Sequence, residues 1–183
     1  MAQLATFAGG CFWCIEAALA QVRGVSQVVS GYMGGSSANA NYRAVCTGTT
    51  GHAEVVQLTY DPAQVSFELL LEMFFHLHDP TTLNRQGNDI GTQYRSEIFA
   101  HDEAQLETAR QFISTAQADF DAPIVTAISR ASTFYPAESY HQDYFNQNPQ
   151  QSYCAYLIAP KLAKFHRTFN TALRHTSAAA ERS

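Results

Sequence analysis

The sequence lacks several features that mark large classes of protein. It has no apolar run long enough to span a bilayer, which excludes a membrane-spanning helix. Its formal net charge of −5 provides no attraction to nucleic acids or anionic membranes, so neither is an expected partner. Its opening segment, "MAQLATFAGG", lacks the basic and apolar regions of a secretion signal, so we expect a cytoplasmic protein.

Cysteine is scarce as well. Four cysteines among 183 residues are too few for a disulfide scaffold, and in a reducing compartment they indicate catalysis, metal binding or core packing. A zinc site with four thiolates needs paired ligands, but only Cys11 and Cys14 form such a pair, while Cys46 and Cys154 stand alone. The chain also lacks a glycine-rich dinucleotide fingerprint, so we expect no metal, flavin or nicotinamide cofactor.

Apolar periodicity predicts alternating strands and helices in a single domain, without internal repeats, over residues 1–175, followed by a loose tail at 176–183. The expected strands occupy residues 3–9, 25–35, 51–62, 92–100 and 122–131. The expected helices occupy 12–22, 66–79 and 102–120, and Ser66 is the expected N-cap of the second. This order favours an α/β fold, an α+β sandwich in which helices flank a mixed or antiparallel sheet.

Two long polar stretches, residues 79–93 and 146–161, show no regular pattern. They are rich in Gly, Asn, Gln or Pro, and we expect both to be irregular, including a long C-terminal segment around Cys154. Long irregular segments in a compact domain often carry function.

Cys11 combines the features of a nucleophilic thiol. It follows a predicted strand and the pair Gly9-Gly10, and it opens a predicted helix. The free N–H groups and positive potential of a helix N-terminus lower the pKa of a thiol, and the glycines leave its sulfur accessible. We therefore expect an acidic thiol at Cys11, with Cys14 one turn inside the helix.

Other functions fit the same stretch. A C-x-x-C pair at a strand-to-helix turn is typical of thiol–disulfide oxidoreductases, which would use Cys11 and Cys14 together. Phe12 and Trp13, however, suit the wall of a small apolar pocket better than a surface that docks disulfides. A noncatalytic binding module would keep this pocket without needing a reactive thiol, and plain core packing of both cysteines is the simplest alternative.

Several longer motifs, in order from about residue 5 to 168, resemble those of the A-type peptide methionine sulfoxide reductases. The resemblance implies a ferredoxin-like core and reduction of the S epimer of methionine sulfoxide, free or in proteins. It also implies thioredoxin as the external reductant. The motifs are "GGCFWCIE", "NYRAVCTGTTGHAEVVQLTYD", "HDPTTLNRQGNDIGTQYRS" and "YHQDYFNQNP".

The resemblance assigns Cys11 as the nucleophile that attacks the sulfoxide sulfur. It also implies that Glu54, Tyr42 and Tyr94 surround the sulfoxide oxygen, where negative charge develops during attack. A glutamate can donate a proton there only if its pKa is raised, and burial in an aromatic pocket raises it.

Four further residues are implied at the substrate site. Phe12 and Trp13 are expected to form the apolar pocket for the S-methyl group. Asp89 is expected to support the site by hydrogen bonding to a water or a tyrosine, and His141 is expected close to the substrate. His76 and His78 lie two residues apart at a helix end and do not share a face, so both are expected to be structural.

The resemblance also bears on recycling. Attack leaves a sulfenic acid on Cys11, which condenses with a nearby thiol to form a disulfide. Cys154 matches the resolving cysteine of many family members, whereas Cys14 stands where other members carry glycine and is the alternative resolver. Cys46 is expected to be a passive neighbour. The sequence leaves the oligomeric state open, and a monomer is the expected form.

Overall fold

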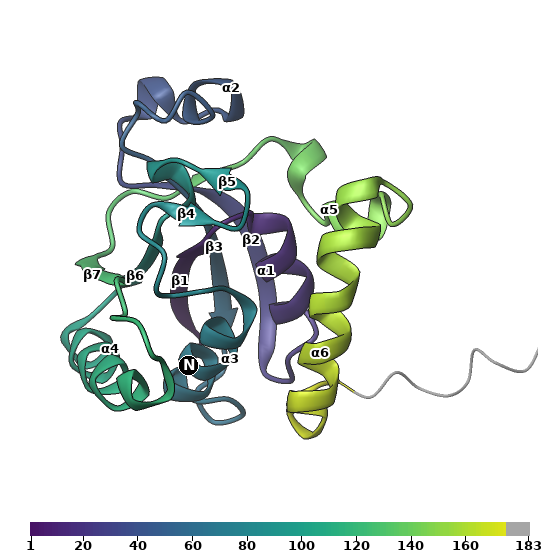
Figure 1. Cartoon of the computed structure of the whole chain (residues 1–183). Coiled ribbons are helices and arrows are strands. Elements are labelled where there is room, and N and C mark those ends of the chain that lie inside the picture. Colours follow the sequence, from purple (N-terminus) through teal and green to yellow (C-terminus); the bar gives the residue numbers. More distant parts are fainter. Residues whose placement is uncertain (175–183) are drawn as a thin grey trace, which may run out of the picture.

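The structure is a computed structural model that describes residues 1–174 (Figure 1). The tail expected at 176–183 lies outside the described residues. Six strands form one mixed sheet in the order β7-β6-β1-β3-β2-β8, in which only β6 and β7 run parallel. The strands are β1 (Gln3–Gly9), β2 (Val25–Met33), β3 (Ala53–Tyr60), β6 (Ser96–Ala100), β7 (Ala127–Arg130) and β8 (Tyr135–Pro136).

The helices confirm the expected α/β architecture. Helices α1, α3 and α6 lie over one face of the sheet, and α4 packs beside them against β6 and β7 (Figure 1). The helices are α1 (Phe12–Leu19), α2 (Tyr42–Val45), α3 (Phe67–Leu77), α4 (Glu103–Ala116), α5 (Tyr144–Gln147) and α6 (Ala159–Phe169). The main hydrophobic core fills the space between these helices and the sheet.

The central topology is ferredoxin-like, as the resemblance implies. Along the chain, β1, α1, β2, β3, α3 and β6 follow one another, and the four strands pair antiparallel in the order β6-β1-β3-β2. A second, smaller apolar cluster on the sheet includes Met33, Val55 and Phe99, and Ala131 and Phe134 pack against it. The segment that carries Ala131 and Phe134 connects β7 to β8, and these two strands form the two edges of the sheet.

Local sequence signals account for several element boundaries. Ser66 caps α3 as expected, because its side chain accepts a hydrogen bond of 3.0 Å from the Leu69 N–H. The strand expected at 92–100 begins only at Ser96, since Thr92–Tyr94 form a 3₁₀ turn. The stretch 79–93 is not wholly irregular either, because it contains a short hairpin of β4 (Arg85–Gln86) and β5 (Asp89–Ile90).

The prediction of an irregular C-terminal segment around Cys154 is wrong. The chain forms a π-helical turn over Cys154–Ile158 that continues into α6. The Pro, Gln and Asn content of the segment favoured a loop, because a proline inside an α-helix removes a hydrogen bond and clashes with the carbonyl four residues earlier. The wider π-turn directly before Pro160 accommodates that proline, so Cys154 lies on ordered helix.

Candidate active site

Cys11 occupies the junction between β1 and α1, where it is the N-cap residue of the helix. The preceding turn requires glycine at position 10, since φ there is +91° and a Cβ would lie 2.6 Å from the Gln86 side chain. No side chain caps the helix at Cys11, so the first N–H groups of α1 remain available near the thiol. The Trp13 N–H is one of them, and it bonds to the thiol and lowers its pKa.

The expectation of an acidic thiol at Cys11 is wrong for this structure. Burial raises the pKa of Cys11 well above its ordinary value, and the negative charge of Glu54 raises it further. The Trp13 N–H and the Tyr153 hydroxyl oppose this shift but do not cancel it. The positive end of the helix is therefore outweighed by desolvation, and the thiol is neutral at neutral pH.

Glu54 lies near the start of β3 and is only 3% exposed. Its Oε1 accepts a hydrogen bond of 3.4 Å from the Phe12 N–H, which brings the carboxyl group to the first turn of α1. Burial raises the pKa of Glu54 to about 8, and the charge of Asp89 adds to the shift, while the Phe12 N–H opposes it. Glu54 therefore keeps its proton at neutral pH, as the expected proton donor requires.

Two tyrosines share the electrostatic environment of Glu54. Tyr42 is the first residue of α2, and Tyr94 is the last residue of the 3₁₀ turn before β6. Burial raises the pKa of both hydroxyls, and the charge of Glu54 contributes to each shift. Three groups that hold their protons thus gather at the N-terminal end of α1, from three different parts of the chain.

Asp89 is connected to Cys11 through the Tyr153 hydroxyl. Its Oδ2 accepts a hydrogen bond of 3.0 Å from the Tyr153 hydroxyl. Burial raises the pKa of Tyr153, as do the charges of Cys11 and Asp89 and the hydrogen bonds to both. The expected tyrosine partner of Asp89 therefore exists. Sequence reasoning missed Tyr153 itself, although its position beside Cys154 was the available signal.

Aromatic rings surround Trp13. Its ring stacks on Tyr144 with centroids 3.8 Å apart, and its Nε1–H donates a 3.1 Å hydrogen bond to His141 Nδ1. Burial lowers the pKa of His141, so its ring is neutral, and the proton must lie on Nε2. Among the described residues, that buried Nε2 has no hydrogen-bond partner. Phe12 is almost completely buried, and its ring lies 5.4 Å from that of His141.

The remaining cysteines differ in their surroundings. Cys14 is 5% exposed, and burial raises its pKa while the charge of Lys161 opposes the shift. Cys154 is fully buried, and burial raises its pKa too. Cys46 is exposed and lies against the Tyr42 hydroxyl. All four cysteines are free thiols.

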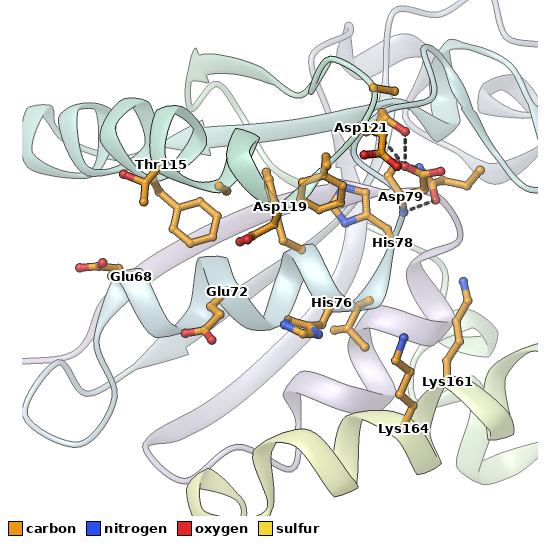
Figure 2. A pocket seen from close by; sticks show the side chains of 18 of the residues that line it. Glu68, Glu72, His76, His78, Asp79, Thr115, Asp119, Asp121, Lys161 and Lys164 are labelled. Carbon is orange, nitrogen blue, oxygen red and sulfur yellow. Dashed lines mark hydrogen bonds between the residues drawn. The ribbon is translucent and has the colours of Figure 1, made fainter.

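The structure contains a small cavity beside Cys11 and a larger groove next to it, and the two share lining residues such as Gln86 and Lys161. The cavity, of about 230 Å³, is lined by Cys11 and Cys14 together with Asp89, Tyr153 and Lys161, among others. The groove, of about 1230 Å³, runs between α3, the end of α4 and the lysines of α6 (Figure 2). None of the site residues expected from the sequence lines that groove. We therefore assign the site by its reactive groups and not by cavity volume.

The described residues contain no group of three His, Cys, Asp or Glu side chains able to hold a metal ion. Nor does the part of the chain that the structure describes include a helix long and apolar enough to cross a membrane. The structure brings Glu54 to Cys11 and places Tyr42 and Tyr94 close to Glu54, and Asp89 lines the cavity beside Cys11, whereas Cys154 is not among the residues that line this cavity. Together these groups form a partly buried thiol, three protonated oxygen acids and an aromatic wall, which suits proton-assisted attack on a small polar group with an apolar substituent.

Comparisons with known proteins agree with this arrangement. A family model described as "Peptide methionine sulfoxide reductase" matches residues 3–173. The chain is 55% identical over 173 residues to the peptide methionine sulfoxide reductase MsrA of Chromobacterium violaceum, which covers 93% of this chain and 98% of that protein. The reduced form of Mxr1 from Saccharomyces cerevisiae superimposes with a TM-score of 0.76 at 38% identity, covering 81% of this chain and 87% of Mxr1. A structure of Mxr1 in complex with Trx2 matches with a TM-score of 0.54 at 26% identity, covering 78% and 84%.

Proposed function

Since the chain belongs to the peptide methionine sulfoxide reductase family and reduces methionine sulfoxide, we propose that Cys11 is its nucleophile. The reaction transfers one oxygen atom. The Cys11 sulfur attacks the sulfoxide sulfur, the S–O bond of the sulfoxide breaks as an S–O bond to Cys11 forms, and the bond between the two sulfurs breaks as methionine leaves. The oxygen and the thiol proton remain on Cys11 as a sulfenic acid, so the methionine sulfur is reduced by two electrons and the cysteine sulfur is oxidised by two. The preference for the S epimer follows from family membership.

The observation that carries this proposal is the raised pKa of Glu54 beside Cys11. A sulfoxide is a neutral electrophile, and attack on its sulfur builds negative charge on its oxygen. A carboxyl group with a pKa of about 8 holds a proton for that oxygen at neutral pH, and Tyr42 and Tyr94 supply further donors. Because the Cys11 thiol is itself neutral in the empty site, its proton is transferred as the sulfur attacks, and over the whole step it ends with the oxygen on the Cys11 sulfenic acid.

The aromatic groups act on the other side of the substrate sulfur. Phe12 and Trp13 form the wall for the S-methyl group, and His141 fixes the indole through its Nδ1. Asp89 holds the Tyr153 hydroxyl beside the Cys11 thiol, where it stabilises negative charge on sulfur. An apolar wall facing a set of proton donors distinguishes the methyl group from the oxygen.

Cys154 is the resolving thiol in this proposal. It condenses with the Cys11 sulfenic acid, forming a disulfide and releasing water. The contact between Tyr153 and the Cys11 thiol supports the assignment, since it keeps the start of the π-helical turn next to the nucleophile. The buried Cys154 sulfur must leave the core to react, which requires the π-turn to rewind. Cys14 is the second candidate, because it lines the same cavity as Cys11.

Thioredoxin completes the cycle by reducing the disulfide with its own two thiols. The complex of yeast Mxr1 with the thioredoxin Trx2 supports this partner. We place the enzyme in the cytoplasm as a monomer that acts on free and protein-bound methionine sulfoxide. The four free thiols of the chain fit a reducing compartment.

The experiment that tests the proposal is a single turnover. The fully reduced protein is mixed with excess methyl sulfoxide substrate without reductant, and both methionine formed and thiols lost are counted. One methionine per chain is expected, with the loss of two thiols. A thiol–disulfide oxidoreductase would form no methionine, and a module that only binds oxidised methionine would lose no thiols. Peptide mapping of the product then distinguishes a Cys11–Cys154 linkage from a Cys11–Cys14 linkage.

A further inference from the structure

The residues that carry the proton donors lie at or next to the ends of their strands. Glu54 is the second residue of β3, where it pairs with Tyr32 of β2, whereas the pairing of β3 with β1 begins only at Val56. Tyr94 precedes β6, whose pairing with β1 reaches only to Ser96. Neither donor is paired with β1, and the turns directly before β3 and β6 need contacts outside the strand pairing to hold them.

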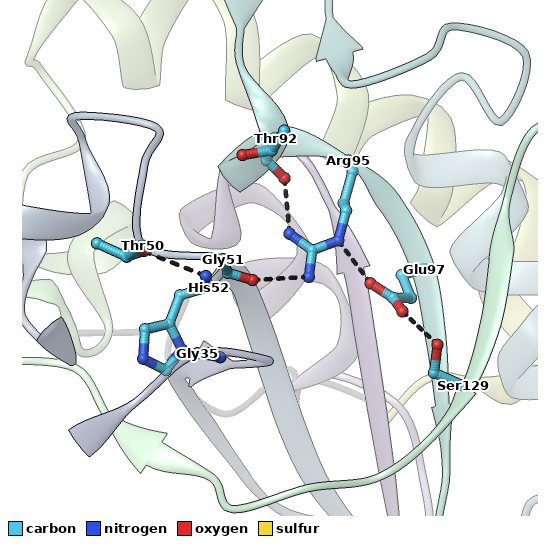
Figure 3. Close-up of polar contacts among 8 residues, drawn as sticks. All are labelled: Gly35, Thr50, Gly51, His52, Thr92, Arg95, Glu97 and Ser129. Atoms are coloured by element: carbon cyan, nitrogen blue, oxygen red, sulfur yellow. Dashed lines mark hydrogen bonds and ion pairs between the residues drawn. The ribbon is translucent and has the colours of Figure 1, made fainter.

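Arg95 supplies contacts to both segments (Figure 3). Its Nη2 donates to the Gly51 carbonyl at 3.0 Å, in the turn that leads into β3. Its Nη1 donates to the Thr92 carbonyl at 2.9 Å, in the 3₁₀ turn that carries Tyr94. A single planar side chain thus connects the turn before Glu54 with the turn that carries Tyr94.

The guanidinium group is itself held by Glu97, which Ser129 holds in turn. Its Nε donates to Glu97 Oε2 at 2.6 Å, and the other oxygen of Glu97 accepts a 2.6 Å hydrogen bond from the Ser129 hydroxyl. The Arg95 side chain is 21% exposed and that of Glu97 is 7% exposed, so the pair is mostly shielded from solvent. Charge-assisted hydrogen bonds of this kind are short and geometrically specific.

Gly34 shows how closely the chain approaches this group. A Cβ at this position would lie 2.9 Å from Arg95 Nη2 and 3.0 Å from the Gly51 carbonyl oxygen, and φ there is +107°. The turn after β2 therefore packs directly on the contact between Arg95 and Gly51, which leaves the guanidinium group little room to move.

We propose that Arg95 is a positioning residue, which holds Glu54 and Tyr94 at a fixed separation around the sulfoxide oxygen. This inference rests on the proposed function of those two donors. Arg95 touches neither the substrate nor the reacting atoms, and it acts through the Gly51 and Thr92 carbonyls. Preorganised donors lower the barrier because they need no rearrangement during attack, and a misplacement of about 1 Å can cost roughly 100-fold in rate.

The variant Arg95→Lys tests this role, since lysine keeps the charge but cannot reach three acceptors with a fixed planar group. We expect the single-turnover rate of methionine formation to fall roughly 10–100-fold, with a KM change below about threefold. Arg130→Lys is the matched control, because Arg130 pairs with Glu103 where both side chains are largely exposed. Its rate should equal that of the wild type.

The pH profile separates positioning from plain destabilisation. In the wild type, Glu54 must be protonated, so the rate falls as pH rises through about 8. A loosened turn admits water to Glu54 and reduces the desolvation that raises its pKa, so Arg95→Lys should move this fall to lower pH. The titratable groups that act on Glu54 or feel its charge are Cys11, Tyr32, Tyr42, Cys46, Asp89 and Tyr94.

Glu97→Gln provides a second variant, should Arg95→Lys not fold. It leaves Arg95 in place but weakens its anchor, and we expect the same changes at a smaller size. An unchanged rate, or a reduced rate with an unshifted pH profile, in the folded variants would overturn the inference. Glu54→Gln, measured in parallel, distinguishes a failure of this inference from a failure of the proposed function. If that variant is fully active, Glu54 is not the acid, whatever the Arg95 variant shows.

Discussion

Glu54 and His78 are two buried titratable side chains that burial drives toward their neutral forms. The pKa of Glu54 rises to about 8, and that of His78 falls to about 4, with desolvation the largest cause in both. Their bonding differs. His78 has both ring nitrogens in hydrogen bonds of 2.7 Å, one with the Phe74 carbonyl and one with the Ser96 hydroxyl. Among the described residues, Glu54 accepts a single bond, of 3.4 Å, from the Phe12 N–H.

A fully bonded buried group stabilises the fold, whereas a buried acid with a free oxygen is available to a substrate. The two groups also give stability opposite dependences on pH. His78 stays neutral in the folded chain while the unfolded chain takes up a proton, so its contribution is lost as pH falls from 6.5 toward 4. Glu54 keeps its proton while the unfolded chain releases one, so stability falls as pH rises from 4.5 to about 8.

The largest expected effect belongs to Cys11, because Glu54 has no reaction to assist without the nucleophile. Cys11→Ser should abolish even the first turnover, since a serine hydroxyl cannot accept the oxygen. Substrate binding should remain, and a direct binding measurement with a methyl sulfoxide checks it. Cys46→Ser serves as the control and should keep the first turnover. More than a trace of methionine from Cys11→Ser would remove this residue from its role.

Glu54→Gln keeps the shape of the side chain but removes the acid. General acid catalysis contributes about 10²–10⁴-fold, so the single-turnover rate should fall by an amount in that range. The decline in rate through pH 8 should disappear with the acid. Because the variant has no titratable group at position 54, its stability relative to wild type should rise as pH increases from 4.5 to about 8. A loss below about threefold at neutral pH would exclude Glu54 as the proton donor.

Sequence patterns predicted the fold well where local signals coincide with tertiary needs. Ser66 and the apolar spacing after it predicted α3, and alternating strands and helices predicted the sheet and its helical layer. The segment around Cys154 failed because its composition favours a loop, while burial of Cys154 and Ile158 in the core stabilises a helix there. Tertiary packing overrides local propensity in such segments.

The candidate site was predictable only in part. Residue motifs identified Cys11 and Glu54, but the pKa of Cys11 depends on how deeply the fold buries it, which helix position alone does not reveal. Tyr153 and Arg95 were missed for a related reason. Their contacts, with Asp89 and Gly51, join residues distant in the chain, and no short-range pattern records them.

We expect an intermediate effect at Trp13, since its proposed role is to contact the substrate without moving a proton. Trp13→Ala removes the apolar wall and should weaken transition-state binding by roughly 1–3 kcal/mol, measured as kcat/KM for methyl sulfoxides. Trp13→Phe should lose less, because it keeps an apolar ring and removes only the Nε1–H bond to His141. If both variants match the wild type while folded, the indole serves core packing alone.

His78 should show the smallest effect on activity and a clear effect on stability. His78→Gln cannot satisfy both the Phe74 carbonyl and the Ser96 hydroxyl, and one unsatisfied buried group costs about 1–3 kcal/mol of unfolding free energy at neutral pH. The single-turnover rate of the folded variant should stay within about threefold of wild type. The deficit in stability should shrink as pH falls from 6.5 toward 4, because the variant lacks the proton uptake, worth up to about 1.4 kcal/mol per pH unit, that weakens the wild type. Urea unfolding across that pH range measures the stability deficit of the variant and its change with pH.

If the deficit is constant with pH, His78 is not the titrating group. If the rate falls as far as in Glu54→Gln, then full hydrogen bonding does not separate structural from catalytic buried groups in this protein.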